Sequence, residues 1–407
     1  MEYEPYIYKL STNALGSLNS DTKENSIILS TTINQSLMSL GYHYYQHKLI
    51  NELVNFTKSV KSEHQFYYVV NPFEVNISNY ENGINKSAQI YLNLDKNKNF
   101  GRSFYKTWEI LFLFDIANTK DFVYTNLNNS TSTVPNITDV TDAVVLFRKK
   151  FNFADKKDYI ELKNLKNNKD DKKQQEKYSS LITSNVKVTI NNDNYINQEQ
   201  LSYELLLNVV FTAIKKQDNK GHFVLRLFNT FTKVTIKIIY LLSCFYDEVY
   251  IYKPYFSRVT SSEKYIICKK FKYDQNKDTK LLEKYYKRFD NILESMKDGK
   301  FIFDIFPELE LSAEYLNSFK FMNVRLVNPQ QIMINKIISY IKENNYYGDK
   351  YHTYKDNEIK AIEWWTRLFF PPSNNIYESN KKDLYKLNDT IQNKHKLEEN
   401  MFAESLL

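Results

Sequence analysis

The chain has 407 residues, a formal net charge of +7 and a hydrophobic fraction of 42%. This length allows two domains or one domain with large insertions, and the modest basic excess fits a polyanionic partner as well as a solvated basic surface. Two cysteines argue against a disulfide scaffold, and the apolar runs are too short to span a bilayer. We expect a globular protein of a reducing compartment, without a secretory signal at its start.

Predicted elements begin with candidate helices in residues 1–100, the clearest within 31–60, where apolar side chains recur at helical spacing. Residues 102–119 predict a helix that leads into a strand at "LFLFDIA". Residues from about 155 to 180 contain a lysine-rich run interrupted by acids, which predicts a solvated insertion. Next, "SNVKVTI" alternates as a strand does, and residues 197–217 predict an amphipathic helix.

The stretch from Lys220 to Tyr273 alternates most regularly. It predicts strands at 221–228, 248–253 and 263–271, with a helix at 231–245 between the first two. The last two strands, joined by a short loop, predict an antiparallel hairpin. Helices and strands alternate in this way throughout the middle of the chain, which indicates an α/β sheet with helices on its faces.

Three regions follow from this pattern. Residues 1–100 form a mainly helical N-terminal extension, and residues 101–273 form the sheet domain, which contains the mixed-charge insertion. Residues 274–407 read as a C-terminal helical region.

The order of motifs in the sheet domain resembles a known family. "HFVLRLF", Lys253-Pro254, Ser257-Arg258 and "SSEKY" match the strand, Lys-Pro, Ser-Arg and Ser-x-Glu of the FtsJ-like RNA ribose 2'-O-methyltransferases. More narrowly, the chain resembles the cap-methylating branch carried by large cytoplasmic DNA viruses. "RSFYKTWEIL" is similar to the segment with the family's first catalytic lysine. The resemblance covers residues 102–273 and implies a Rossmann-like methyltransferase sheet with helices on both faces.

The resemblance also implies a catalytic tetrad of two lysines, an aspartate and a glutamate. Lys106 takes the first lysine position and Glu263 the glutamate. The central lysine position holds Arg226, whose guanidinium stays protonated and cannot act as a general base. The aspartate position falls on Asn192, or on Asp193 after a one-residue slip.

The family binds S-adenosylmethionine at a glycine-rich turn that follows a strand. We align that turn with "FDIANTKDFVYTNL", in which Asp115 keeps the outline and Lys120 and Asp121 stand where the glycines belong. All 7 glycines of the chain are isolated, so no double-glycine turn exists. We therefore expect the donor pocket to be closed and no cofactor to bind, with S-adenosylmethionine as the donor if the protein is active.

Candidate RNA contacts lie in the loop between the last two strands: Lys253, Ser257 and Arg258. Arg258 suits either an RNA phosphate or a bond that braces the loop.

Two other residue clusters are weaker indications of function. His43 and His47 lie one helical turn apart without an acidic third ligand at zincin spacing, so we expect no metal. Trp364 and Trp365 are adjacent on a predicted helix. This spacing favours one ring in the core and one exposed ring over an aromatic cage for a cationic ligand.

Two hypotheses follow from these observations. The chain is a catalytically degenerate relative of the cap ribose 2'-O-methyltransferases that serves as an RNA-binding or scaffold subunit, with a protein partner in a transcription or RNA-processing complex. Alternatively, it is an active S-adenosylmethionine-dependent enzyme with an atypical site. Its location would be the cytoplasm, meaning the host cytoplasm or the virion if it is viral.

Overall fold

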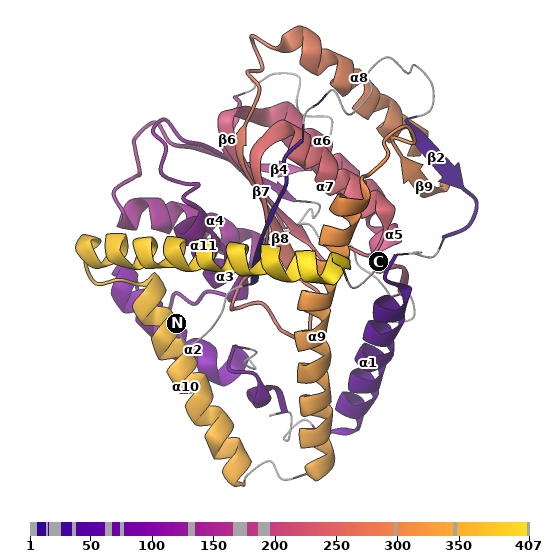
Figure 1. Ribbon diagram of the computed structural model, residues 1–407. Helices are drawn as coiled ribbons and strands as arrows, with labels where there is room; N and C mark the ends of the chain where they lie inside the picture. Colours follow the sequence, from indigo (N-terminus) through magenta and orange to yellow (C-terminus); the bar gives the residue numbers. More distant parts are fainter. Residues whose placement is uncertain are drawn as a thin grey trace.

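A seven-stranded sheet lies at the centre of the molecule, and helices cover both of its faces (Figure 1). The computed structural model describes residues 6–13, 15, 26–34, 38–61, 67–73, 77–128, 135–165, 177–185, 196–296, 299–344 and 348–404. Among the helices in these ranges, none combines the length and apolar character needed to cross a bilayer.

The strand order of the sheet is β1-β7-β8-β6-β5-β3-β4. Strands β3, β4, β5 and β6 run parallel, whereas β8, β7 and β1 are antiparallel to their neighbours. The strands are Tyr6–Leu10 (β1), Val123–Asn128 (β3), Tyr159–Asn164 (β4), Ser179–Ser184 (β5), Gln217–Leu227 (β6), Tyr246–Lys253 (β7) and Lys264–Phe271 (β8). This topology confirms the predicted Rossmann-like sheet and its antiparallel β7–β8 pair.

Helices make up most of the remaining described chain. They are Leu40–Ser59 (α1), Ile77–Leu92 (α2), Arg102–Phe114 (α3), Pro135–Lys150 (α4), Gln198–Leu201 (α5), Tyr203–Lys216 (α6), Lys233–Phe245 (α7), Thr279–Ser295 (α8), Ala313–Glu343 (α9), Asp349–Phe369 (α10) and Asn374–Glu404 (α11). A short 3-10 helix, Tyr67–Val70 (η3), lies between α1 and α2, and a separate two-stranded sheet joins Ile27–Ser30 (β2) to Phe301–Ile305 (β9).

Neighbouring residues on the central strands enter different apolar cores. Leu181 and Val224 pack with residues of α3, α4 and α10, whereas Ile182 and Leu225 pack with residues of α6, α7 and α8. Successive side chains of a strand point to opposite faces, so the sheet separates two cores that helices enclose.

The strand predicted at residues 111–117 is wrong, because α3 continues to Phe114. Every residue from Ser103 to Phe114 is buried, and the helix contacts α4, α10 and α11. A helix surrounded by protein loses the polar face that gives it a visible period. Its apolar run then reads like a buried strand.

Two other regions, the predicted insertion and the N-terminal region, also differ from expectation. Strand β4 lies inside the stretch expected to be an insertion, and its half-exposed position at the sheet edge explains its polar sequence. Strand β5 precedes the predicted strand "SNVKVTI", most of which lies outside the described residues. The N-terminal region, expected to be mainly helical, also supplies the edge strand β1, whose residue Tyr8 pairs with Ile251.

Candidate functional site

Three side chains singled out from the sequence meet at one end of the sheet. Lys106 lies on α3, Arg226 near the end of β6, and Glu263 immediately before β8. Lys106 Nζ lies 2.8 Å, and Arg226 Nε 2.7 Å, from the same carboxylate oxygen, Oε1 of Glu263. Open α/β sheets bind their ligands at the carboxyl ends of the parallel strands, and β6 ends here.

The fourth member of this cluster is Asn185, which follows β5. Its Oδ1 accepts a hydrogen bond of 3.0 Å from Nη1 of Arg226. β5 and β6 are parallel neighbours, with Ser184 opposite Leu225, so the residue after Ser184 faces the end of β6. The residues first considered for this position, Asn192 and Asp193, lie outside the described residues. The available signal is the short apolar stretch "SSLITS", of which only the first two residues fall in the predicted insertion.

The cluster combines two basic side chains with one carboxylate, and each shifts the pKa of its neighbours. Burial raises the pKa of Glu263, but the adjacent Lys106 and Arg226 outweigh burial and hold the pKa at about 2. Burial lowers the pKa of Lys106, Glu263 opposes this effect, and Arg226 adds to it. When Lys106 is protonated, two cations therefore surround one carboxylate, and the cluster carries net positive charge.

The three residues assigned to the donor turn precede β3, whereas the family's turn follows a strand. Asp115 follows the last residue of α3 and has a φ of 57°. It forms an ion pair with Lys381, whose Nζ lies 2.7 Å from Oδ1. Lys120 and Asp121 are exposed and precede β3. Open α/β sheets bind ligands beyond the carboxyl ends of their strands, so the family's turn corresponds to the sequence that follows β3, residues 129–134, which lie outside the described residues. Because the second half of α3 was predicted as a strand, the family's donor turn was aligned one element too early in the chain.

The chain around this second position offers little that fits S-adenosylmethionine. Residues 129–134, "NSTSTV", contain no glycine, so the close backbone approach of the family's turn is missing in the sequence. Among the described residues, the cavity between α3 and β5 has about 10 Å³ and is lined by Thr107, Val140 and Asn185 among others. Small-molecule sites usually offer roughly 300–1,000 Å³.

The loop between β7 and β8 places one of its three candidate RNA contacts at the surface. Lys253 is buried and donates to the carbonyl oxygens of Ser261 at 2.5 Å and Glu263 at 3.0 Å. Ser257 is also buried. Arg258 is exposed, with its guanidinium carbon 5.8 Å from the ring centre of Tyr68. Lys253 thus braces the loop from within, and Arg258 faces outward.

A buried carboxylate that we had missed holds the other side of this loop. Glu109 on α3 accepts hydrogen bonds from the Tyr252 hydroxyl at 2.7 Å and the Trp365 indole at 2.9 Å. It also accepts from the backbone amides of Tyr255 and Phe256, at 2.9 and 3.2 Å. Burial raises the pKa of Glu109 to about 7 against these donors. Glu109 lies in "KTWEIL", and an acid within an apolar helix could have indicated a buried, hydrogen-bonded carboxylate.

The histidine pair and the tryptophans serve as packing groups. His43 and His47 are buried, with their Nε2 atoms 3.1 Å apart. Within the described ranges no group of three His, Cys, Asp or Glu side chains is placed to hold a metal ion. Trp365 is buried against Glu109, while the partly buried Trp364 contacts Phe73 and Tyr255. Cys244 and Cys268 are free thiols in the core, as expected.

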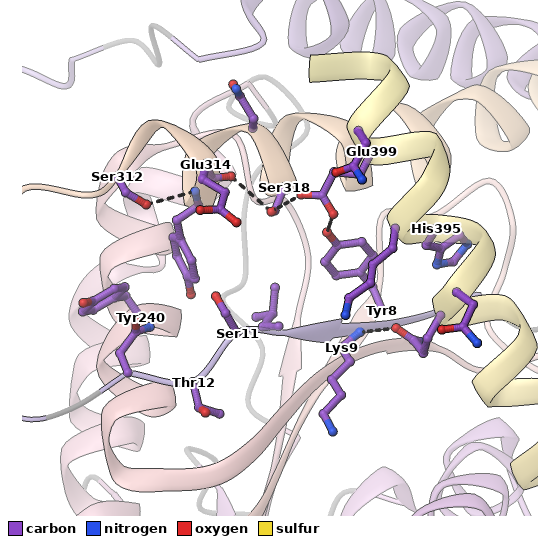
Figure 2. A pocket seen from close by; sticks show the side chains of 18 of the residues that line it. Tyr8, Lys9, Ser11, Thr12, Tyr240, Ser312, Glu314, Ser318, His395 and Glu399 are labelled. Atoms are coloured by element: carbon purple, nitrogen blue, oxygen red, sulfur yellow. Dashed lines mark hydrogen bonds between the residues drawn. The ribbon is translucent and has the colours of Figure 1, made fainter. Parts of the chain in front are cut away.

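A larger cavity lies away from this cluster, at the β1 edge of the sheet. It has about 1230 Å³ and lies between β1, the first turns of α9, and α11 (Figure 2). Its lining is polar, and Glu399 of α11 accepts a hydrogen bond of 2.5 Å from the Tyr8 hydroxyl and another from Ser318. Its lining includes four acids, Asp247, Glu310, Glu314 and Glu399, and two lysines, Lys9 and Lys396.

Sheet order and clustered side chains define a Rossmann-like methyltransferase domain. Residues 131–271 match the model of the FtsJ-like methyltransferase family, so this part of the chain is similar to that family.

Individual relatives differ in how much of the chain they match. Protein R383 of Acanthamoeba polyphaga mimivirus is 27% identical over 298 residues, which cover 71% of this chain and 70% of that protein. A cap-specific mRNA (nucleoside-2'-O-)-methyltransferase 1 of Mus musculus is 41% identical over 75 residues, 18% of this chain and 9% of that protein. An inactive cap-specific mRNA (nucleoside-2'-O-)-methyltransferase 1B of Caenorhabditis briggsae is 24% identical over 173 residues, 41% of this chain and 20% of that protein.

The matched segments thus span only a small part of the cap methyltransferases' own length. A solved structure described as a ribosomal RNA methyltransferase of Plasmodium falciparum gives a TM-score of 0.33 at 16% identity. It covers 42% of this chain and 97% of that chain.

Proposed function

We propose that this chain binds RNA at the carboxyl end of its sheet and does not transfer a methyl group. The observation that carries the proposal is the ion pair between Arg226 and Glu263 at the position of the family's central lysine. Attack by a ribose hydroxyl requires a group that helps to remove its proton. A guanidinium does not release a proton at any working pH, and the amide of Asn185 is not a base either.

The relatives support RNA as the substrate class. The mouse relative is named for the mRNA cap and the 2' hydroxyl, and the Caenorhabditis briggsae relative is named inactive. The exposed Arg258 suits a contact with a phosphate backbone, and the largely buried Lys106 and Arg226 add positive charge at the same end of the sheet. A protein partner in a transcription or RNA-processing complex, in the cytoplasm or a virion, would place this RNA-binding subunit beside an active enzyme.

An active enzyme is the second candidate, and Lys106 is the observation in its favour. The side chain keeps its bond to Glu263, and burial lowers its pKa, as a general base requires. In this case Lys106 would accept the hydroxyl proton while Arg226 positions the RNA.

Titration calorimetry with S-adenosylmethionine and its demethylated product separates the two candidates, together with a methyl-transfer assay on capped RNA. Loss of about 4 kcal/mol moves a micromolar site to the millimolar range, so we expect no saturation below roughly millimolar donor. We also expect Arg226→Lys to remain inactive, because the sequence after β3, residues 129–134, contains no glycine. Micromolar donor binding with methyl transfer by the wild-type chain would overturn the proposal.

RNA binding is measured separately, by fluorescence anisotropy with a capped single-stranded oligonucleotide at several salt concentrations. We expect binding that weakens as salt rises, because phosphate contacts release counterions. A chain that binds neither the donor nor RNA would leave only the scaffold role.

A further inference from the structure

Helix α1 lies beside the candidate site and is joined to its loop by a chain of side-chain amides. Gln46 of α1 donates to the side chain of Gln330 on α9 at 3.0 Å, and Gln330 donates to the carbonyl oxygen of Thr260 at 2.7 Å. His43 packs against Phe231, just beyond the end of β6, with ring centres 5.3 Å apart. Figure 1 shows α1 running alongside α9. The inner face of α1 is therefore fixed to the loop that carries Arg258.

The outer face of α1 combines exposed aromatic rings with positive charge. Tyr44 is 61% exposed and Tyr45 is 58% exposed. Lys48 extends over Tyr45, with Nζ 6.0 Å from the ring centre. The helix contains one acid, Glu52, which is half-buried, so the exposed positions carry lysine and no carboxylate.

We propose that Tyr44, Tyr45 and Lys48 form a stacking surface for the bases of single-stranded RNA. This inference rests on the proposed RNA-binding function and extends that site along α1. Exposed aromatic rings stack on bases of any sequence, and a neighbouring ammonium attracts the phosphate that links them. The absence of acids on the exposed face of α1 favours a polyanion over a protein partner that docks by apolar contact alone.

RNA and a protein partner predict different responses to substitution. Stacking needs the flat ring face, whereas apolar docking needs only bulk. Tyr44→Leu/Tyr45→Leu keeps apolar bulk and removes the rings, and Tyr44→Ala/Tyr45→Ala removes both. Lys48→Gln removes one charge from the same surface, and Tyr385→Ala on α11 removes a partly exposed tyrosine elsewhere as a matched control.

Anisotropy with an uncapped oligouridylate measures the effect on the full chain. Stacking is worth about 1–3 kcal/mol per base, so both tyrosine double variants should bind roughly tenfold or more weakly than wild type, and Tyr385→Ala should bind normally. Lys48→Gln should lower the slope of log affinity against log salt by about one. If both double variants bind as tightly as a binding-competent wild type, the surface is not used and the proposed function stands. If the leucine variant binds like wild type and the alanine variant does not, stacking is ruled out. If wild type does not bind RNA, the proposed function falls first.

Discussion

Arg226 and Glu263 form a largely buried ion pair, with Nε of the arginine 2.7 Å from Oε1 of the glutamate. Lys106 approaches the same oxygen at 2.8 Å, so one carboxylate ties β6 and the start of β8 to α3. In the proposed non-catalytic protein, the position of the ancestral tetrad serves as a structural anchor. The anchor lies at the carboxyl end of β6, the end of the sheet where we propose that RNA binds.

The anchor makes Glu263 more important for stability than either cation. In Glu263→Ala, Lys106 and Arg226 face each other in a buried place without a counter-charge. We expect the free energy of unfolding to fall by about 3–5 kcal/mol, the usual loss when one member of a buried pair is removed. Lys106→Met should cost less, because Glu263 keeps Arg226 as its partner. Urea unfolding of the two variants measures both values, and equal losses would contradict this role of the carboxylate.

Glu109 predicts a dependence of stability on pH. Its pKa in the folded chain is about 7, above the usual 4.5, because burial disfavours the charged form. Between these values the folded chain holds a proton that the unfolded chain has released. The stabilising effect of this proton is fully present below about pH 4.5 and is lost as pH rises through about 7, by up to about 3 kcal/mol.

Urea unfolding of wild type and Glu109→Gln across this pH range tests the shift. Glutamine keeps an acceptor for the Trp365 indole but does not titrate, so the variant should lose less stability than wild type as pH rises. A constant difference between the two proteins at all pH values would show that Glu109 does not change its charge in this range.

The regular alternation after residue 220 was enough to predict the arrangement of β6, α7, β7 and β8. Each strand there is a short apolar run bounded by a turn, and α7 is long enough to be recognised as a helix. Arg226 and Glu263 were found through the motifs of the same region, and Lys106 through the likeness of "RSFYKTWEIL" to the family's first lysine segment. The sequence therefore predicted this part of the candidate cluster.

The elements at the other half of the sheet were harder to place, for two physical reasons. Helix α3 is buried on all sides and lacks a polar face, so its second half was read as a strand and the donor turn was displaced. Strand β4 lies at the sheet edge, where a polar sequence is tolerated. Asn185 was missed because its position depends on the pairing of β5 with β6, which joins residues far apart in the sequence.

Gln392 on α11 predicts how the β1 edge is protected. Its Nε2 donates to the carbonyl oxygen of Ile7 at 3.0 Å, and its Oε1 accepts from the amide of Lys9 at 2.8 Å, as a neighbouring strand would. An open strand edge offers the same groups to other chains. In Gln392→Ala both bonds are lost, and because water replaces them at this exposed place we expect a cost of about 1 kcal/mol. Hydrogen exchange at the Lys9 amide should become faster.

Asn388→Ala is the matched control for this prediction. Gln392 Nε2 also donates to Asn388 Oδ1 at 3.1 Å, so this variant removes a contact of the same side chain without touching β1. Exchange at Lys9 should then stay close to the wild-type rate, because both bonds to the strand remain. If the Lys9 amide exchanges as slowly in Gln392→Ala as in wild type, the edge is protected by the bulk of α11 and not by the side-chain amide of Gln392.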